Sequence, residues 1–364
     1  MSNKIISDLQ VKIVQQLIEN SPADLIITPE KLGLTSKQHP LLLAALDELS
    51  RIFGGQLEVR SEPDAPQAAP QTAFRATLSS PNILLDKKVI QQQMTTAAQD
   101  LFTKCQICLS TDSTNKTIKT MPAGSILLAE QQTSGRGRYG RTWLSPFAAG
   151  IYLSLFLQRD QFSKGVAGLS LAIGVMLVRF LRELHIPANS PNNPNSTKHL
   201  GLKWPNDLLI SINPICKLGG VLVELSENDV IIGIGINYSY SGEDKLDNKL
   251  DPAAEKPAEK QIAAVASLMD PDTAKSMNRS LATAMLINQL TNGLHQFFAQ
   301  GFSSFDAEWN ALNLMADLPL AVDTGQETLR GICRGVDSSG CLLLSNEQTG
   351  DLIPINSGTV LLDT

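Results

Sequence analysis

A loop rich in glycine and arginine constrains this chain more than any other segment. It alternates three glycines with three arginines and ends on a tryptophan, over Gly135–Trp143 (G-R-G-R-Y-G-R-T-W). Glycine lets backbone N–H groups approach a ligand closely, and guanidinium groups donate paired hydrogen bonds to carboxylates and phosphates. The tryptophan adds an aromatic face for a flat base. The loop therefore predicts a binding site for a nucleotide or an acyl phosphate.

Residues 135–140 also satisfy the dinucleotide motif G-x-G-x-x-G. That motif needs a helix that opens at the glycines, with its N-terminus facing the pyrophosphate. Here Pro146 follows closely, and Ile151–Leu157 has the alternation of a strand. The context thus disfavours a Rossmann fold. The plainer alternative is a solvated basic surface loop.

Three further motifs follow the loop. They are K-W-P-N-D at Lys203–Asp207, K-L-G-G-V-L-V-E at Lys217–Glu224 and G-I-G-I-N at Gly233–Asn237. In this order, the four motifs resemble those of the biotin–protein ligases. The resemblance runs from about Leu84 to the C-terminus. Before that, the chain is more weakly similar to the winged-helix region of the bifunctional ligase-repressors.

The resemblance implies an enzyme that activates biotin with ATP to biotinyl-5'-adenylate. The biotinyl group then passes to a lysine of a biotin carboxyl carrier protein. Biotin and ATP are the substrates, Mg²⁺ enters with the nucleotide, and no metal site of the protein itself is expected. Both steps gather negative charge at one point, which fixed cations and N–H groups can stabilise.

The resemblance also assigns residues to this reaction. The expected catalytic residues are Lys217 as the central cation, Arg138 in the loop, and Asp207 to orient the incoming amine. The expected biotin-binding residues are Ser113, Thr114, Asn115, Gln132, Gly135, Arg136, Gly137, Arg138 and Lys217. The expected ATP- and adenylate-binding residues are Arg136, Arg138, Trp143, Lys203, Asn206, Lys217 and Asn237.

Each assignment has a structural alternative. Ser113–Asn115 makes a good helix N-cap, and Asp207 closes a segment with the composition of a turn. The alternative for Lys217 is a solvated lysine at the start of a strand, with no part in catalysis. Arg141 is suited to bracing the loop, and Trp204 to packing.

The patterns predict an α+β fold in three parts. We expect a winged-helix-like domain over 1–80, a catalytic domain over 81–314 with a central mixed sheet backed by helices, and a C-terminal domain over 315–364. The last part shows short strands separated by turns, and the resemblance implies a small β-barrel there. Polar insertions occupy 187–195 and 239–259, where we expect no chemistry.

Helical spacing of apolar residues in the N-terminal part predicts three helices and a two-stranded wing, Gln56–Arg60 with Phe74–Leu78. The second helix is expected to start at Thr28-Pro29. The third, over Pro40–Phe53, should read DNA, yet it carries one cation against two acids. DNA binding is therefore doubtful.

Composition fits a cytoplasmic enzyme. No apolar run reaches membrane-spanning length, and a net charge of −6 argues against a general nucleic-acid binder. Cys105 and Cys108 form a C-x-x-C in a predicted strand, where residues three apart point to opposite faces, so we expect no shared metal. Some family members form homodimers through the central domain. The alternative functions are a biotin-operon repressor and a lipoate or octanoyl ligase.

Overall fold

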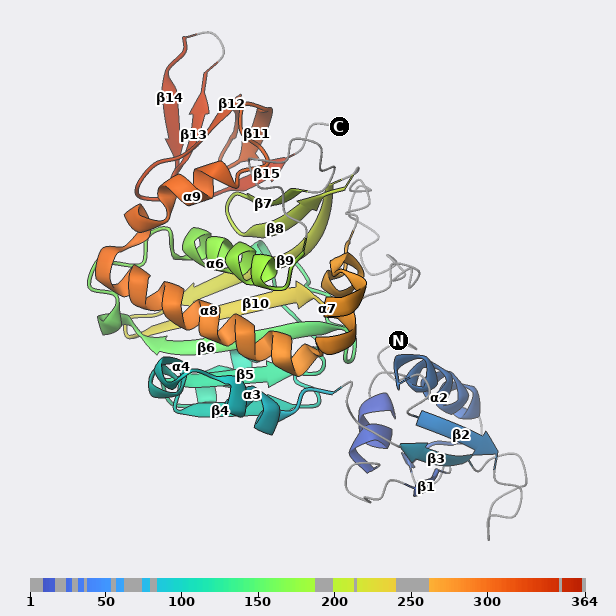
Figure 1. Ribbon diagram of the computed structural model, residues 1–364. Helices are drawn as coiled ribbons and strands as arrows, with labels where there is room; N and C mark the ends of the chain where they lie inside the picture. Colours follow the sequence, from blue (N-terminus) through green and yellow to red (C-terminus); the bar gives the residue numbers. More distant parts are fainter. Residues whose placement is uncertain are drawn as a thin grey trace.

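The computed structural model of the chain describes residues 9–16, 24–27, 32–35, 38–53, 57–61, 74–78, 84–186, 199–212, 215–239, 262–346 and 349–361. Their strands form three separate sheets, with helices against the largest one (Figure 1). The predicted α+β class with a central mixed sheet is confirmed. None of the described helices is long and apolar enough to cross a membrane.

The central sheet has the strand order β4-β5-β6-β10-β9-β8-β7. Only β4 and β5 pair in parallel, and the other neighbours are antiparallel. The strands are β4 (Lys104–Cys108), β5 (Ser125–Ala129), β6 (Gly150–Gln158), β7 (His199–Lys203), β8 (Asp207–Ser211), β9 (Ile215–Leu225) and β10 (Asp229–Asn237). The strand predicted after the Arg-Gly loop is therefore β6, which confirms the argument against a Rossmann fold.

One face of this sheet is covered by helices. The helices α6 (Leu169–Glu183) and α8 (Arg279–Gln300) lie across it (Figure 1), and α3 (Lys87–Gln93) and α4 (Thr96–Leu101) pack against α8. Apolar side chains from alternate strand positions fill the core between these layers. Helix α6 begins at Leu169, directly after Gly165 and Gly168, which adopt positive φ.

The opposite face, which we call the site face, is covered only in part. The short α5 (Thr114–Thr117) and η4 (Ile118–Thr120) lie there, above a small cluster that includes Leu127, Phe156 and Ile231. Because residues alternate along a strand, the β10 residues Ile231, Gly233 and Gly235 share this face. The two glycines leave space above the sheet for other side chains.

The C-terminal strands form an antiparallel sheet with the order β14-β13-β12-β11-β15. They are β11 (Pro319–Asp323), β12 (Thr328–Val336), β13 (Leu342–Ser345), β14 (Leu352–Ile355) and β15 (Thr359–Leu361). The predicted short strands and turns are confirmed. A closed barrel is not formed by these pairings, because β14 pairs with β13 and β15 with β11 at the two edges.

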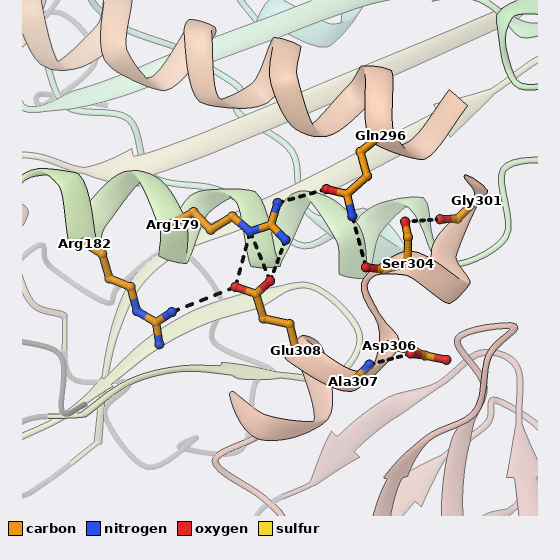
Figure 2. Close-up of polar contacts among 8 residues, drawn as sticks. All are labelled: Arg179, Arg182, Gln296, Gly301, Ser304, Asp306, Ala307 and Glu308. Atoms are coloured by element: carbon orange, nitrogen blue, oxygen red, sulfur yellow. Dashed lines mark hydrogen bonds and ion pairs between the residues drawn. The ribbon is translucent and has the colours of Figure 1, made fainter. Parts of the chain in front are cut away.

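The joint between the core and the C-terminal sheet is held by Arg179 of α6 (Figure 2). Its guanidinium binds the carboxylate of Glu308 on α9 (Asp306–Ala311) through two nitrogens, at 3.1 and 2.5 Å. It also donates to Gln296 of α8 at 3.2 Å and lies over the Phe305 ring. A forked guanidinium is suited to such a junction, since it reaches several partners at once.

The N-terminal residues form a three-stranded sheet with the order β1-β3-β2. Its strands are β1 (Asp24–Ile27), β2 (Leu57–Ser61) and β3 (Phe74–Leu78), next to α2 (His39–Phe53) and helical residues 9–16. The predicted pairing of the two wing strands is confirmed, with Leu57 opposite Leu78. The helix predicted from Thr28-Pro29 lies outside the described residues, as do most of both polar insertions.

The remaining short helices are connections. They are η5 (Arg138–Gly140), η6 (Arg159–Gln161), η7 (Val265–Leu268), α7 (Pro271–Ser276) and η8 (Phe302–Ser304).

The C-x-x-C thiols do lie on a strand, β4, where Cys105 is buried and Cys108 is half-buried. Burial raises the pKa of the Cys105 thiol, and that of Cys108 to about 11. Both thiols are therefore protonated and unreactive at neutral pH.

Candidate functional site

The floor of the candidate site consists of glycines on β9 and β10. A Cβ on Gly233 would lie 2.2 Å from Asn115 Oδ1, and one on Gly235 would lie 2.5 Å from the Trp143 ring. Gly220 faces Gly235 across the strand pair, and a Cβ there would lie 3.5 Å from the same ring. The glycines of the two strand motifs therefore let the α5 tip and Trp143 lie directly on the sheet.

A β-bulge directs Lys217 to this face. The pairing of β8 with β9 shifts register between Leu208 and Leu209, so that Leu218 packs in the helix-covered core. Lys217 then points to the side of Gly220, whose added Cβ would lie 3.6 Å from Lys217 Cε. Bulges often re-aim a side chain next to a functional site. Here the bulge brings the predicted central cation onto the site face.

Lys217 lies in a group of charged and aromatic side chains. Its ammonium forms an ion pair with Asp207, the first residue of β8, and lies 5.3 Å from the centre of the Trp143 ring. Burial lowers the pKa of the Arg138 guanidinium, while the nearby Asp207 carboxylate acts in the opposite direction. The structure thus brings together all three predicted catalytic residues, Lys217, Asp207 and Arg138.

Two asparagines hold the strands that carry this group. Asn237 donates to the Lys217 carbonyl at 3.1 Å, and Asn206 donates to the Val221 carbonyl at 2.8 Å. Both side chains therefore bind the backbone of β9. Lys203 ends β7 opposite Asp207 in the β7–β8 pair, which places it beside the charged group.

The Arg-Gly loop is closed at its base by backbone hydrogen bonds. Trp143 N donates to Gly135 O at 2.9 Å, and Gly137 N donates to Arg141 O at 2.7 Å. Tyr139 at its tip has φ of 55° and is mostly exposed. Arg138 stacks on this ring, and Arg136 is exposed. The loop is thus a hydrogen-bonded hairpin with an exposed tip.

The α5 tip meets the start of the loop at Gln132. Thr114 donates to Gln132 Oε1 from its backbone N at 2.9 Å and from its hydroxyl at 3.0 Å. Ser113 caps α5 by position, but its side chain makes no capping hydrogen bond. The N-cap position predicted for this segment is therefore confirmed, and the Ser113 hydroxyl is not used by the cap. Ser113 is buried and directly precedes Thr114, another residue expected to bind the ureido ring.

Asn115 is an expected biotin ligand whose side-chain amide hydrogens are both used by the protein itself. Its Oδ1 accepts from Ser154 at 2.6 Å, and its Nδ2 donates to Leu222 O at 3.3 Å and to Glu224 at 3.0 Å. Both amide hydrogens are thus used. The side chain connects α5 to two strands, β6 and β9, so the geometry favours a supporting role over direct contact.

Sequence reasoning missed a buried ion pair below the loop. Glu130 follows β5 directly, is 1% exposed, and pairs with Arg279 at the start of α8, which is 4% exposed. Glu130 also accepts from Leu85 N at 2.5 Å, and Arg279 donates to Gly150 O at 2.9 Å. The pair thus connects three segments of the chain. They are Leu85 before α3, Gly150 at the start of β6, and Glu130 itself, which leads from β5 toward the Arg-Gly loop.

Two contacts join the site to the C-terminal sheet. Trp204 is buried, and its indole N–H donates to Gly340 O at 3.2 Å. Arg141 donates to the Thr359 hydroxyl at 3.4 Å. The predicted packing role of Trp204 and bracing role of Arg141 agree with these contacts. Among the described residues, no group of three or more histidine, cysteine, aspartate and glutamate side chains is arranged to hold a metal.

Comparisons with known proteins agree with this geometry. A profile of the Biotin/lipoate A/B protein ligase family matches residues 105–237. The chain is 32% identical over 260 residues to the Bifunctional ligase/repressor BirA of Escherichia coli, covering 69% of this chain and 71% of the relative. It is 29% identical over 286 residues to the Biotin--[acetyl-CoA-carboxylase] ligase of Mycobacterium tuberculosis, covering 76% and 95%.

A solved structure has the same fold. It is a biotin protein ligase from Aquifex aeolicus in complex with biotin and ATP, with 25% sequence identity and a TM-score of 0.54. The superposition covers 71% of this chain and 98% of that protein.

Proposed function

This chain belongs to the biotin–protein ligase family, and from that premise we propose that it biotinylates a carrier protein in two steps. The biotin carboxylate first attacks the α-phosphorus of ATP, which gives biotinyl-5'-adenylate and releases pyrophosphate. A lysine of a biotin carboxyl carrier protein then attacks the acyl carbon, and AMP leaves. The chain is an enzyme of this class, and ATP and biotin are its substrates.

One observation carries the assignment of the reacting centre: Lys217, Asp207 and Arg138 gather beside Trp143 on the glycine floor. We assign Lys217 as the cation between the biotin carboxylate and the α-phosphate, with Arg138 above it. Fixed cations stabilise charge that develops in both transition states without reorganisation. Asp207 holds the Lys217 ammonium and is also placed to orient the incoming amine.

The remaining expected ligands follow the same face of the sheet. Ser113, Thr114 and Gln132 form the proposed ring end of the biotin site, with Gly135, Arg136 and Gly137 closing over it. Trp143, Lys203, Asn206 and Asn237 surround the proposed adenylate. Asn115 belongs to this site through the support that it gives to Thr114. Mg²⁺ enters with the nucleotide, bound to its phosphates.

An activation assay tests this function. Biotin-dependent pyrophosphate release from ATP should be rapid, while lipoate and octanoate in place of biotin should give only the background rate. Transfer to a purified carrier domain should follow and should require its acceptor lysine. Equal activity with lipoate would instead indicate a lipoate ligase.

We further propose the division into domains at 1–80, 81–314 and 315–364, with the C-terminal sheet in the position of the family's barrel. We also propose a cytoplasmic location, where ATP is supplied, and a homodimer through the central domain. The helix, strand order and hairpin of the N-terminal part support a winged-helix fold. A repressor function would depend on the surface of α2.

A further inference from the structure

We propose that Ser145 is a positioning residue for biotin specificity, because it fixes which way the Gln132 amide faces. Ser145 lies two residues beyond the Arg-Gly loop and outside every motif that suggested the function. It is 6% exposed, and it pairs with Gln132 across the base of the loop. The inference rests on the proposed function, since it concerns the ring end of the biotin site.

A short series of hydrogen bonds connects the two ends of the loop. Gln132 Nε2 donates to Ser145 Oγ at 2.8 Å, and Gln132 N donates to Ser145 O at 3.3 Å. The Ser145 hydroxyl in turn is directed at Trp143 O, at 3.5 Å. On the other side, Gln132 Oε1 accepts twice from Thr114. Gln132 is therefore held at both ends of its amide group.

These contacts allow only one orientation of the amide. The backbone N–H of Thr114 can only donate, so the atom facing it must be the Gln132 oxygen. The nitrogen must then face Ser145, whose hydroxyl must accept because its own hydrogen points to the Trp143 carbonyl. With alanine at position 145, a largely enclosed amide hydrogen would lose its acceptor, which is costly.

The fixed orientation determines what the site offers to a ligand. Both lone pairs of Gln132 Oε1 are used by Thr114, so the remaining capacity of this amide is the second Nε2 hydrogen, which donates. The Thr114 hydroxyl donates its hydrogen to Gln132, so it can only accept from a ligand. One donor beside one acceptor matches a cyclic urea, which presents a carbonyl beside an N–H. An acyl chain without a urea gains nothing from this pair.

Ser145→Ala tests the proposal in the full-length enzyme. We expect the KM for biotin in pyrophosphate exchange, and the Kd in calorimetry, to rise about tenfold, which is the size expected for a lost acceptor. The KM for ATP should stay within about twofold and kcat within about threefold. The reason is that the hydrogen bonds among Thr114, Gln132 and Ser145 involve neither Lys217 nor Arg138. Ser145→Cys keeps a weaker acceptor and should give an intermediate value.

The matched control is Ser163→Ala. This serine also donates to a backbone carbonyl, that of Phe298 at 3.2 Å, but it follows the far end of β6. Its removal should leave both KM values unchanged.

A double-mutant cycle with Gln132→Ala distinguishes positioning of the Gln132 amide from general support of the loop. If Ser145 acts through Gln132, Ser145→Ala should change the biotin KM by less than about twofold when Gln132 is already absent. Additive effects, or an equal rise in the KM for ATP, would overturn the proposal and make Ser145 a simple support of the loop. Absence of biotin-dependent exchange in the wild type would instead refute the proposed function itself.

Discussion

At the scale of single residues, Lys217 is the group on which the proposed chemistry depends most. Replacing it with alanine should slow adenylate formation by about a hundredfold or more, equivalent to ~3 kcal/mol of lost charge stabilisation. Single-turnover formation of the adenylate measures this directly. The fixed charge is the cause, so Lys217→Arg should retain more activity than Lys217→Ala.

The control for this substitution is Lys164→Ala, at an exposed lysine far along the chain from the charged group. It should leave the adenylation rate unchanged. Near-normal adenylation by Lys217→Ala would move the role of central cation to Arg136.

Residue by residue, the sequence anticipated the groups that lie inside motifs and missed those outside them. Lys217, Asp207 and Arg138 each belong to a recognisable pattern, and the structure brings them together. Ser145 was missed because a serine before a proline reads as an ordinary turn. Glu130 was missed because its partner lies 149 residues away, and no spacing rule connects them.

At the scale of elements, the Arg-Gly loop is an ordered hairpin whose tip is exposed, which is suited to a lid. Arg138 is the half-buried cation of this hairpin, and its guanidinium lies against the Tyr139 ring. We predict that Arg138→Ala releases biotinyl-adenylate faster than the wild type, because the lid loses its charge contact with the phosphate. Rapid filtration of enzyme carrying labelled adenylate measures the release. Unchanged retention together with unchanged transfer to the carrier would refute the lid.

The ion pair of Glu130 and Arg279 should stabilise the junction of three elements. Arg279→Met leaves a carboxylate buried without its cation, which typically costs about 3–5 kcal/mol. We expect that loss in the free energy of unfolding in urea. Adding Glu130→Gln should recover part of it, because glutamine still accepts from Leu85 N but carries no charge.

An exposed ion pair provides the comparison for this experiment. Arg334 and Asp317 are 45% and 76% exposed, so Arg334→Met should cost less than about 1 kcal/mol. Equal losses at the two sites would show that burial does not set the strength of the Glu130 pair.

Element boundaries were predicted less well than element types. Alternating and helical patterns indicate the type of the strands in the central sheet and of the long helices α6 and α8. They do not indicate β1, because its four residues are too few to show alternation. Helix α9 ends at Ala311, because residues 312 and 314 bind the backbone of Leu202 on β7 instead of continuing the helix. This contact covers the outer edge of β7, a tertiary effect with no local signal.

At the scale of the whole molecule, the N-terminal module is the part whose function is most open. The exposed positions that are described on α2 are Pro40, Leu43, Ala44 and Asp47, and none of them is a cation. Specific operator binding draws much of its free energy from phosphate neutralisation. The surface of α2, as far as the structure describes it, therefore argues against DNA reading.

We predict that the protein binds promoter DNA of biotin genes no more tightly than random DNA at physiological salt, even with biotinyl-adenylate bound. A mobility-shift titration with both DNAs measures this. Nanomolar, adenylate-dependent binding to one palindromic site would contradict it and make the chain a repressor as well.

Deleting residues 1–78 should leave partial ligase activity, because every assigned ligand lies beyond that point. The loss should appear as reduced stability, since Phe147 and Ala148 pack in the same apolar cluster as Leu9 and Leu46 of the module. Thermal unfolding of the shortened chain, with adenylation measured well below its midpoint, distinguishes the two effects. Complete inactivity of the folded fragment would contradict the prediction.

The hydrogen bond from the Trp204 indole to Gly340 limits where two ligase genes could recombine and still encode a folded protein. A crossover that ended the chain at residue 314 would strip an enclosed indole N–H of its acceptor in the middle of the K-W-P-N-D segment. The same crossover would remove the partner of Arg141 at the base of the loop. We therefore expect the last 50 residues to be exchangeable only together with the catalytic part. An exchange of modules between ligases should succeed more readily near residue 80, where the catalytic ligands remain intact.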